Sequence, residues 1–211
     1  MTSTKRDFNA EAATWDEEPR RVKLASDVFR AIAEVSGLRP AMTALDFGCG
    51  TGLVTLQLAS CVAQVTGADS SRGMLDVLEE KARSRSIDNV TTRLVDLDRG
   101  DVLEGSYDLA VSTMALHHIR DVPALLRLFA QVLKAEGQIC LADLDSENGE
   151  FHANNDGVFH FGFDREALKR ALSEAGFSDL ADSTAAEIEK PSADGTLKTF
   201  SVFLISGRLR T

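Results

Sequence analysis

Ala44-Leu45-Asp46-Phe47-Gly48-Cys49-Gly50-Thr51-Gly52 is the stretch of the sequence that decides the fold. An apolar run, Met42 to Phe47, leads into three glycines at alternate positions, and a second apolar segment begins at Leu53. Glycine has no Cβ, so it tolerates positive φ and lets a ligand approach the backbone closely. The first N–H groups of a helix attract polar or anionic atoms. The stretch therefore predicts a strand, a tight ligand-binding turn and a helix.

Length and composition are those of a globular protein with one core. The chain has 211 residues, 44% of them hydrophobic and 27% charged, so we expect a single domain, 1–211. No window approaches the roughly 18 apolar residues that a membrane helix needs. No apolar secretory signal follows the N-terminus, so we expect a cytoplasmic address. A net charge of -10 argues against nucleic acid and anionic lipid as partners.

The three cysteines predict buried thiols. Cys49, Cys61 and Cys140 are odd in number, widely spaced and without a Cys-x-x-Cys pair. Such a set favours neither a disulfide frame nor a zinc site. We expect no metal site in this chain.

Strand and helix patterns alternate along most of the chain. Predicted strands span 42–47, 63–69, 90–95, 107–113 and 138–143, and predicted helices span 21–37, 53–58, 74–82, 121–136 and 164–175. Parallel neighbours need long right-handed crossovers, so this order predicts a doubly wound, mostly parallel α/β sheet with helices on both faces. Two further strands, at 177–188 and 199–206, adjoin through a hairpin connection at 190–198, so the last strand should run antiparallel.

Acidic residues end three of the predicted strands, where a doubly wound sheet binds its ligand. They are Asp46, Asp69 and Asp96. Asp69 lies 21 residues after Gly48. That is close to the spacing of about 20 at which an acid accepts hydrogen bonds from the ribose hydroxyls of a nucleotide. The spacing indicates an adenosine-type ligand.

The glycine spacing argues against a dinucleotide. Its fingerprint, G-x-G-x-x-G/A, requires a small third residue, and Leu53 stands at that position. Asp46 in front of the turn suits a cation better than a pyrophosphate, and no P-loop lysine follows the glycines. A nucleotide-dependent oxidoreductase is therefore the weaker alternative.

The sequence resembles the class I S-adenosylmethionine-dependent methyltransferases of the small-molecule type, like those that methylate ubiquinone and menaquinone precursors. Four motifs carry the resemblance, which covers roughly 8–206: Leu45–Gly52, Asp69–Leu75, Asp96-Leu97, and Tyr107-Asp108-Leu109 leading to Leu116-His117-His118-Ile119. It implies a Rossmann-like, seven-stranded sheet with an antiparallel last strand. It also implies S-adenosylmethionine as cofactor, S-adenosylhomocysteine as product and methyl transfer to a small-molecule acceptor by in-line displacement.

The same resemblance implies roles for the residues around the glycine turn. Backbone at Gly48 and Gly50 would lie against the methionine part of the cofactor, and Asp46 would help to hold its amino group. Asp69 would accept from the ribose hydroxyls, with Ser70 beside it.

For the adenine, the resemblance implies three residues. Met74 would pack on the ring, Asp96 would accept from its amino group, and Leu97 would donate its backbone N–H. Two alternatives stay open: Met74 also has the spacing of a core residue, and Asp98 could replace Asp96.

At the methyl-donor end the resemblance implies Thr113 and Ser112. A general base is needed only if the acceptor loses a proton, and histidine suits that task near neutral pH. His118 and His117 follow the fourth predicted strand, and we slightly favour His118 as the catalytic residue. In the alternative, both histidines only shape the loop.

The chain is expected to divide its work among three parts. Residues 1–40 form a helical lid and lead-in, in which Trp15 and Arg20 could cover the cofactor; 41–143 form the cofactor-binding half; and 144–211 form the acceptor-side loop, helix and terminal hairpin. The acceptor-side loop carries two more histidines, His152 and His160.

A second hypothesis is a non-catalytic cofactor-binding module that acts through a partner protein. It predicts a sealed or absent acceptor cavity. The sequence indicates neither the acceptor nor the oligomeric state.

Overall fold

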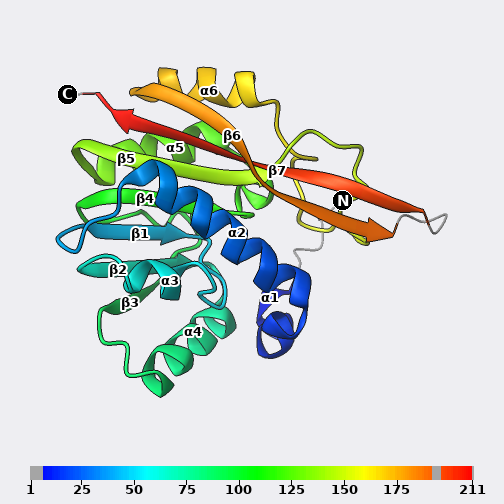
Figure 1. Ribbon diagram of the computed structural model, residues 1–211, viewed down its shortest axis with the longest axis horizontal. Helices are drawn as coiled ribbons and strands as arrows, with labels where there is room; N and C mark the ends of the chain where they lie inside the picture. The colour runs from blue at the N-terminus through cyan, green and yellow to red at the C-terminus, as the bar shows by residue number, and fades with distance from the viewer. Residues whose placement is uncertain (1–6, 192–195, 211) are drawn as a thin grey trace.

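Seven strands form one sheet in the computed structural model, which describes residues 7–191 and 196–210 (Figure 1). Their order is β3-β2-β1-β4-β5-β7-β6. The strands are β1 Thr43–Phe47, β2 Gln64–Asp69, β3 Val90–Leu94, β4 Tyr107–Thr113, β5 Leu133–Leu144, β6 Phe177–Pro191 and β7 Leu197–Leu209. Pairing is parallel from β3 across to β5, whereas β7 runs antiparallel to both β5 and β6. The predicted doubly wound sheet with an antiparallel last strand is confirmed.

Several helices begin or end at capping residues. They are α1 Phe8–Glu11, α2 Pro19–Ser36, α3 Thr55–Ala59, α4 Arg72–Ser84, α5 Val122–Val132 and α6 Arg165–Glu174, with 3-10 turns at Ala12–Glu17, Leu97–Arg99 and Leu116–His118. Proline opens α2, and Gly37 ends it at φ +55°. Asp164 caps α6 by accepting from the Ala167 N–H at 2.7 Å.

Helices cover both faces of the sheet, as the alternating pattern predicted. Along β1, Ala44 packs in a cluster with Ile32 of α2, whereas the next residue, Leu45, packs in a second cluster with Leu125 and Phe129 of α5. Successive strand residues point to opposite faces, so one strand serves two cores. In Figure 1, α2 and α3 lie in front of the sheet and α5 lies behind it.

The predicted helix at 121–136 is wrong at its C-terminal end. The helix α5 stops at Val132, and β5 begins at Leu133, which pairs with Tyr107 of β4. The segment from Leu133 to Glu136 has good helix formers, but pairing with a buried neighbouring strand overrides that weak preference. A register shift in this pair and φ +59° at Glu136 mark the irregular join to the rest of β5.

The predicted terminal hairpin forms, but its two strands are longer and its connection is shorter than predicted. Pro191, the last residue of β6, pairs with Leu197, the first of β7. Residues 192–195 of the predicted connection lie outside the described residues.

The strand order reverses between β1 and β4. A doubly wound sheet opens a crevice at the carboxyl ends of its strands at such a switch point, and this is where the glycine turn after β1 lies. Across residues 7–191 and 196–210, none of the helices combines the length and apolar character that crossing a bilayer requires.

Candidate functional site

A cavity of about 1260 Å³ opens beside the switch point. Most of the residues predicted for the site line it: Asp46, Gly48, Gly50, Asp69, Ser70, Met74, Asp96, Leu97, Thr113, His117 and His118. Ser112 differs, because its side chain is fully buried within the sheet and does not line the cavity. The structure thus gathers the predicted residues around one space.

The glycines of the turn after β1 meet two different demands. Gly48 and Gly52 have φ of +72° and +81°, and a Cβ on either would lie 2.3 Å from Ala115 Cβ or 2.2 Å from Leu78 Cδ1. These two positions therefore need glycine for both backbone conformation and packing. At Gly50 the nearest atom to such a Cβ lies 4.0 Å away, so the space in front of this residue is open to a ligand.

Asp69, at the end of β2, both holds the glycine turn and faces the cavity. One carboxylate oxygen accepts from the Gly50 N–H and the other from the Ser71 N–H, each at 2.8 Å. A carboxylate has about four acceptor positions, so each oxygen can accept another hydrogen bond. Asp69 can therefore bind a pair of neighbouring hydroxyls.

Asp46 is a buried acid at the end of β1. Its side chain accepts from Thr55 Oγ1 at 2.6 Å, and the residue is 1% exposed. Burial raises the pKa of Asp46 to about 7, against the lowering effect of the Thr55 hydrogen bond, and the charge of Asp69 raises it further. A cation that enters the cavity beside Asp46 would therefore stabilise its ionised form.

The acids after β3 lie in a short, self-bonded turn. The carboxylate of Asp96 accepts from the Asp98 N–H at 3.1 Å and caps Leu97–Arg99, while Asp101 accepts from the Asp96 N–H at 2.8 Å. Asp98 also lines the cavity, so the choice between the two acids stays open. Met74 is 2% exposed and lines the cavity as well, so its core role and its predicted ligand contact are compatible.

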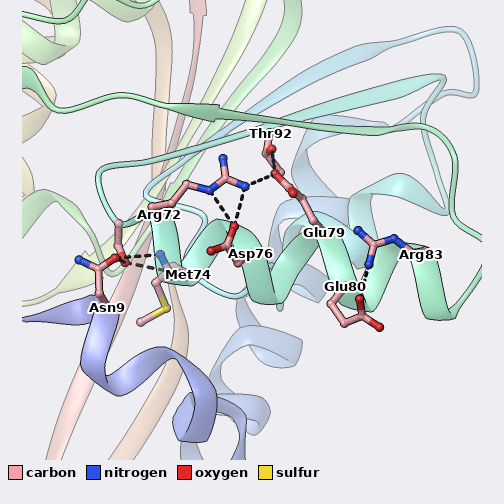
Figure 2. A network of polar contacts seen from close by, with 10 residues as sticks. Asn9, Arg72, Met74, Asp76, Glu79, Glu80, Arg83 and Thr92 are labelled. Atoms are coloured by element: carbon pink, nitrogen blue, oxygen red, sulfur yellow. Dashed lines mark hydrogen bonds and ion pairs between the residues drawn. The ribbon is translucent and has the colours of Figure 1, made fainter.

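The N-terminal segment is fastened to the start of α4. The Asn9 side-chain oxygen accepts from Ser71 Oγ at 2.9 Å and from the Gly73 N–H at 2.8 Å. Figure 2 shows Asn9 at this end of α4, next to Met74. The sequence did not predict this contact, because an isolated asparagine in a polar segment has no characteristic spacing.

A second fastening joins the N-terminal segment to the glycine turn. Asp16 accepts from Thr51 Oγ1 at 2.5 Å with one oxygen and pairs with Lys81 at 2.6 Å with the other. The predicted covering residues Trp15 and Arg20 both line the cavity. Residues 8–17, which contribute Phe8 and Trp15 to the cavity lining, are the segment that we call the lid.

Two adjacent histidines follow β4, and each ring has a fixed partner. His117, 1% exposed, places Nδ1 at 2.7 Å from the fully buried Asp143, whose oxygens also accept the backbone N–H groups of His117 at 3.3 Å and Leu144 at 2.7 Å. His118 places Nδ1 at 2.8 Å from the Gly157 carbonyl oxygen, which can only accept. Both Nδ1 atoms therefore donate, and the lone pair of each neutral ring sits on Nε2.

A third histidine joins them from the loop after β5. The ring centroid of His152 lies 5.0 Å from that of His117 and 5.7 Å from that of His118. The Phe159 N–H donates to the His117 carbonyl at 2.9 Å, which ties this loop to the turn after β4. His160 bonds a backbone carbonyl at 2.9 Å and does not line the cavity.

Sequence reasoning missed Asp143, and it placed His152 in the acceptor-side loop without grouping it with His117 and His118. Asp143 ends the fifth predicted strand, so the strand-end rule that selected Asp46 and Asp69 would have found it. His152 had no comparable signal, because it lies more than thirty residues from His117 in an irregular loop.

Comparison with known proteins gives a family match over most of the chain. The family described as "Methyltransferase domain" matches residues 18–181. The "Uncharacterized methyltransferase GK2543" of Geobacillus kaustophilus is 31% identical over 179 residues, which cover 80% of this chain and 70% of that protein. The "Uncharacterized methyltransferase C1347.09" of Schizosaccharomyces pombe is 37% identical over 120 residues, 54% of this chain and 42% of that protein.

The chain spans less than half the length of several curated relatives that it matches. A solved structure, "Haemonchus contortus Phosphoethanolamine N-methyltransferase 2 in complex with S-adenosyl-L-methionine", has the same fold with a TM-score of 0.69 at 18% identity. The likeness covers 87% of this chain and 52% of that one.

Proposed function

The chain belongs to the methyltransferase domain family, and from that membership we propose that it transfers a methyl group from S-adenosylmethionine to a small-molecule acceptor. A lone pair of the acceptor forms a bond to the methyl carbon while the carbon–sulfur bond breaks, and S-adenosylhomocysteine leaves as a neutral thioether. The observation that carries the proposal is the pair of acids, Asp46 and Asp69, at the ends of neighbouring strands around an open glycine turn.

Each part of the cofactor has a matching group in the cavity. The buried Asp46 faces the ammonium group, Asp69 accepts from the ribose hydroxyls beside Ser70, and Gly50 leaves room for the methionine chain. Asp96, Leu97 and Met74 hold the adenine from the ends of β3 and α4. That a protein of the same fold is described with bound S-adenosylmethionine supports this placement.

The acceptor occupies the remainder of the cavity, beside Thr113 and the histidines. At about 1260 Å³ the cavity exceeds the ~300–1,000 Å³ of an ordinary small-molecule site, which leaves room for a cofactor and a small acceptor together. Holding the two in line is a large part of catalysis, worth up to ~7–11 kcal/mol. If the acceptor loses a proton, His117 or His118 can take it on Nε2.

The volume also favours an enzyme over the alternative, a binding module that acts through a partner protein. Such a module predicts a sealed or absent acceptor space. The net charge of -10 supports a metabolite rather than nucleic acid as the acceptor. We propose that the protein works in the cytoplasm, which suits its three free cysteines.

Calorimetry with S-adenosylhomocysteine tests the proposal. The wild-type chain should bind it, and Asp69→Asn and Asp69→Ala should bind at least about tenfold more weakly, because a hydrogen bond to a charged group is worth ~1.5–3 kcal/mol. Asp76→Ala is the matched control, since this acid lies on the outer face of α4 with a side chain 61% exposed. Circular dichroism checks that each variant is folded.

No binding by the wild type, or unchanged binding by folded Asp69 variants, would overturn the proposal. The acceptor can then be sought by incubating the enzyme with isotope-labelled cofactor and a metabolite extract, with mass spectrometry to find the labelled product.

A further inference from the structure

Three imidazole rings that line the cavity form a cluster that could hold a metal ion. One ring nitrogen from each of His117, His118 and His152 can be chosen so that all three atoms lie within 4.8 Å of one another. His117 is buried, and the other two are partly buried. A group of three histidine ligands is the ligand set of a catalytic zinc site with its fourth position open.

The hydrogen bonds behind two of these rings are those that metal-bound histidines make. The His117 Nδ1–H donates to the Asp143 carboxylate at 2.7 Å, and the His118 Nδ1–H donates to the Gly157 carbonyl at 2.8 Å. Such outer partners fix the tautomer, so that Nε2 carries the lone pair, and make the ring a better ligand. In both residues, the Nε2 atom is therefore prepared to coordinate.

A general-base role accounts for less of this arrangement. Removal of one proton from an acceptor needs one histidine, and it gives no reason for His152 to approach from a separate loop. The fully buried Asp143 carboxylate accepts from His117 and from the Leu144 N–H. A divalent cation on the three rings would place positive charge beside this carboxylate, in a cavity that Asp46 and Asp69 also line.

We propose that His117, His118 and His152 bind one zinc ion, with its open position facing the cavity. Imidazole suits zinc among the divalent metals. Zinc–nitrogen bonds of about 2.0–2.1 Å place tetrahedral ligand atoms roughly 3.4 Å apart. The three ring nitrogens lie within 4.8 Å of one another, so the most distant of them must approach by about 1 Å or more. The partly buried His152, on the loop after β5, is the residue that we expect to move.

The site deepens the methyl-transfer proposal and rests on it for its chemistry. An acceptor hydroxyl or thiol that coordinates the open position loses its proton to water more readily, because zinc stabilises the anion. The oxygen or sulfur lone pair then forms the bond to the methyl carbon, and the carbon–sulfur bond of the cofactor breaks with both electrons on sulfur. The zinc site thus favours O- or S-methylation over methylation of a phosphate-bearing amine.

Metal titration of the whole chain, expressed without a polyhistidine tag and treated with a chelator, tests the site. We expect one zinc ion per chain by calorimetry, and with cobalt the visible absorption of a tetrahedral complex. His152→Ala should weaken zinc binding by more than about a hundredfold, since the loss of a ligand exceeds the ~10–100-fold cost of losing an outer partner such as Asp143. The matched control is His160→Ala, a histidine of the same loop outside the cavity, which should bind zinc like the wild type.

S-adenosylhomocysteine calorimetry on the same metal-free samples separates this inference from the proposed function. If the wild type binds S-adenosylhomocysteine but neither zinc nor cobalt, or if His152→Ala and His160→Ala bind zinc equally, the zinc site is refuted and the methyltransferase proposal stands. If zinc binds in the expected pattern and S-adenosylhomocysteine does not bind, the zinc site stands and its role in methyl transfer falls. Retained S-adenosylhomocysteine binding by His152→Ala shows that the variant is folded.

Discussion

Cofactor binding should depend steeply on pH because of Asp46. Burial raises the pKa of this carboxyl to about 7 in the free protein, while a carboxyl in the unfolded chain titrates near 3.8. The raised pKa means that the protonated acid is stable in the fold. Because of Asp46, the free energy of unfolding therefore falls by on the order of 4 kcal/mol as the pH rises from about 4 to about 7. The cofactor ammonium group offsets this cost by pairing with the ionised form.

The size of the effect on binding follows from the same pKa. Only the ionised fraction of Asp46 is ready for the ammonium group, so the apparent Kd is multiplied by about 2 at pH 7, about 11 at pH 6 and about 100 at pH 5. S-adenosylhomocysteine should therefore bind about fiftyfold more weakly at pH 5 than at pH 7. At pH 6 its binding should release about 0.9 proton.

Calorimetry in two buffers of different ionisation enthalpy measures both the Kd and the number of protons released. Asp46→Asn should bind weakly and almost independently of pH, while Asp76→Asn, on the outer face of α4, should keep the wild-type slope. A wild-type Kd that stays constant between pH 5 and pH 7 would refute the reasoning. The reasoning would also be refuted if the Kd of Asp46→Asn changed with pH as steeply as that of the wild type.

Three other substitutions test the packing and the lid. Gly52→Ala should destabilise the fold by about 1–3 kcal/mol, seen as a lower Tm, because its φ is +81° and the new Cβ would meet Leu78; an unchanged Tm would contradict this. Leu125→Ala should lower the free energy of unfolding in urea by about 2–5 kcal/mol because the side chain is fully buried. A decrease of less than 1 kcal/mol would contradict this and would show that neighbouring side chains fill the space left by the leucine. Lys81→Ala removes the ion pair with Asp16, which should be worth about 0.2–1 kcal/mol. Amide hydrogen exchange in the lid should therefore become up to roughly fivefold faster, while exchange in β4 should not change.

The sequence predicted most of the sheet because most of its strands carry an apolar pattern of their own. The predicted strand at 107–113 matches β4 in both limits. The predicted C-terminal end of α5 was wrong. Local preference favours a helix at Leu133 and Glu136, but pairing with β4, which lies far away in the sequence, makes this segment a strand. Boundaries of this kind depend on tertiary contacts.

The predicted cofactor residues meet in one cavity because the parallel strands that carry them end at the same edge of the sheet. Asp46, Asp69 and Asp96 could be found by that rule. The grouping of His152 with His117 could not be found, because it depends on the path of an irregular loop. Nor could the contact of Asp16 with the glycine turn, since surface carboxylates are common and nothing in the spacing distinguishes this one.

The position of β7 has a consequence for how the chain folds as it is synthesised. β7 is the last strand of this sheet to be made, yet it lies between β5 and β6, and among residues 7–191 and 196–210 no other strand pairs with β6. In Figure 1 these two long strands run side by side at one margin of the sheet. Until residues 197–209 leave the ribosome, β5 has an unpaired outer edge next to buried apolar residues such as Ile139 and Leu141. An exposed edge of this kind pairs readily with other chains. The partly synthesised protein should therefore be prone to aggregate and to depend on chaperones until β7 inserts.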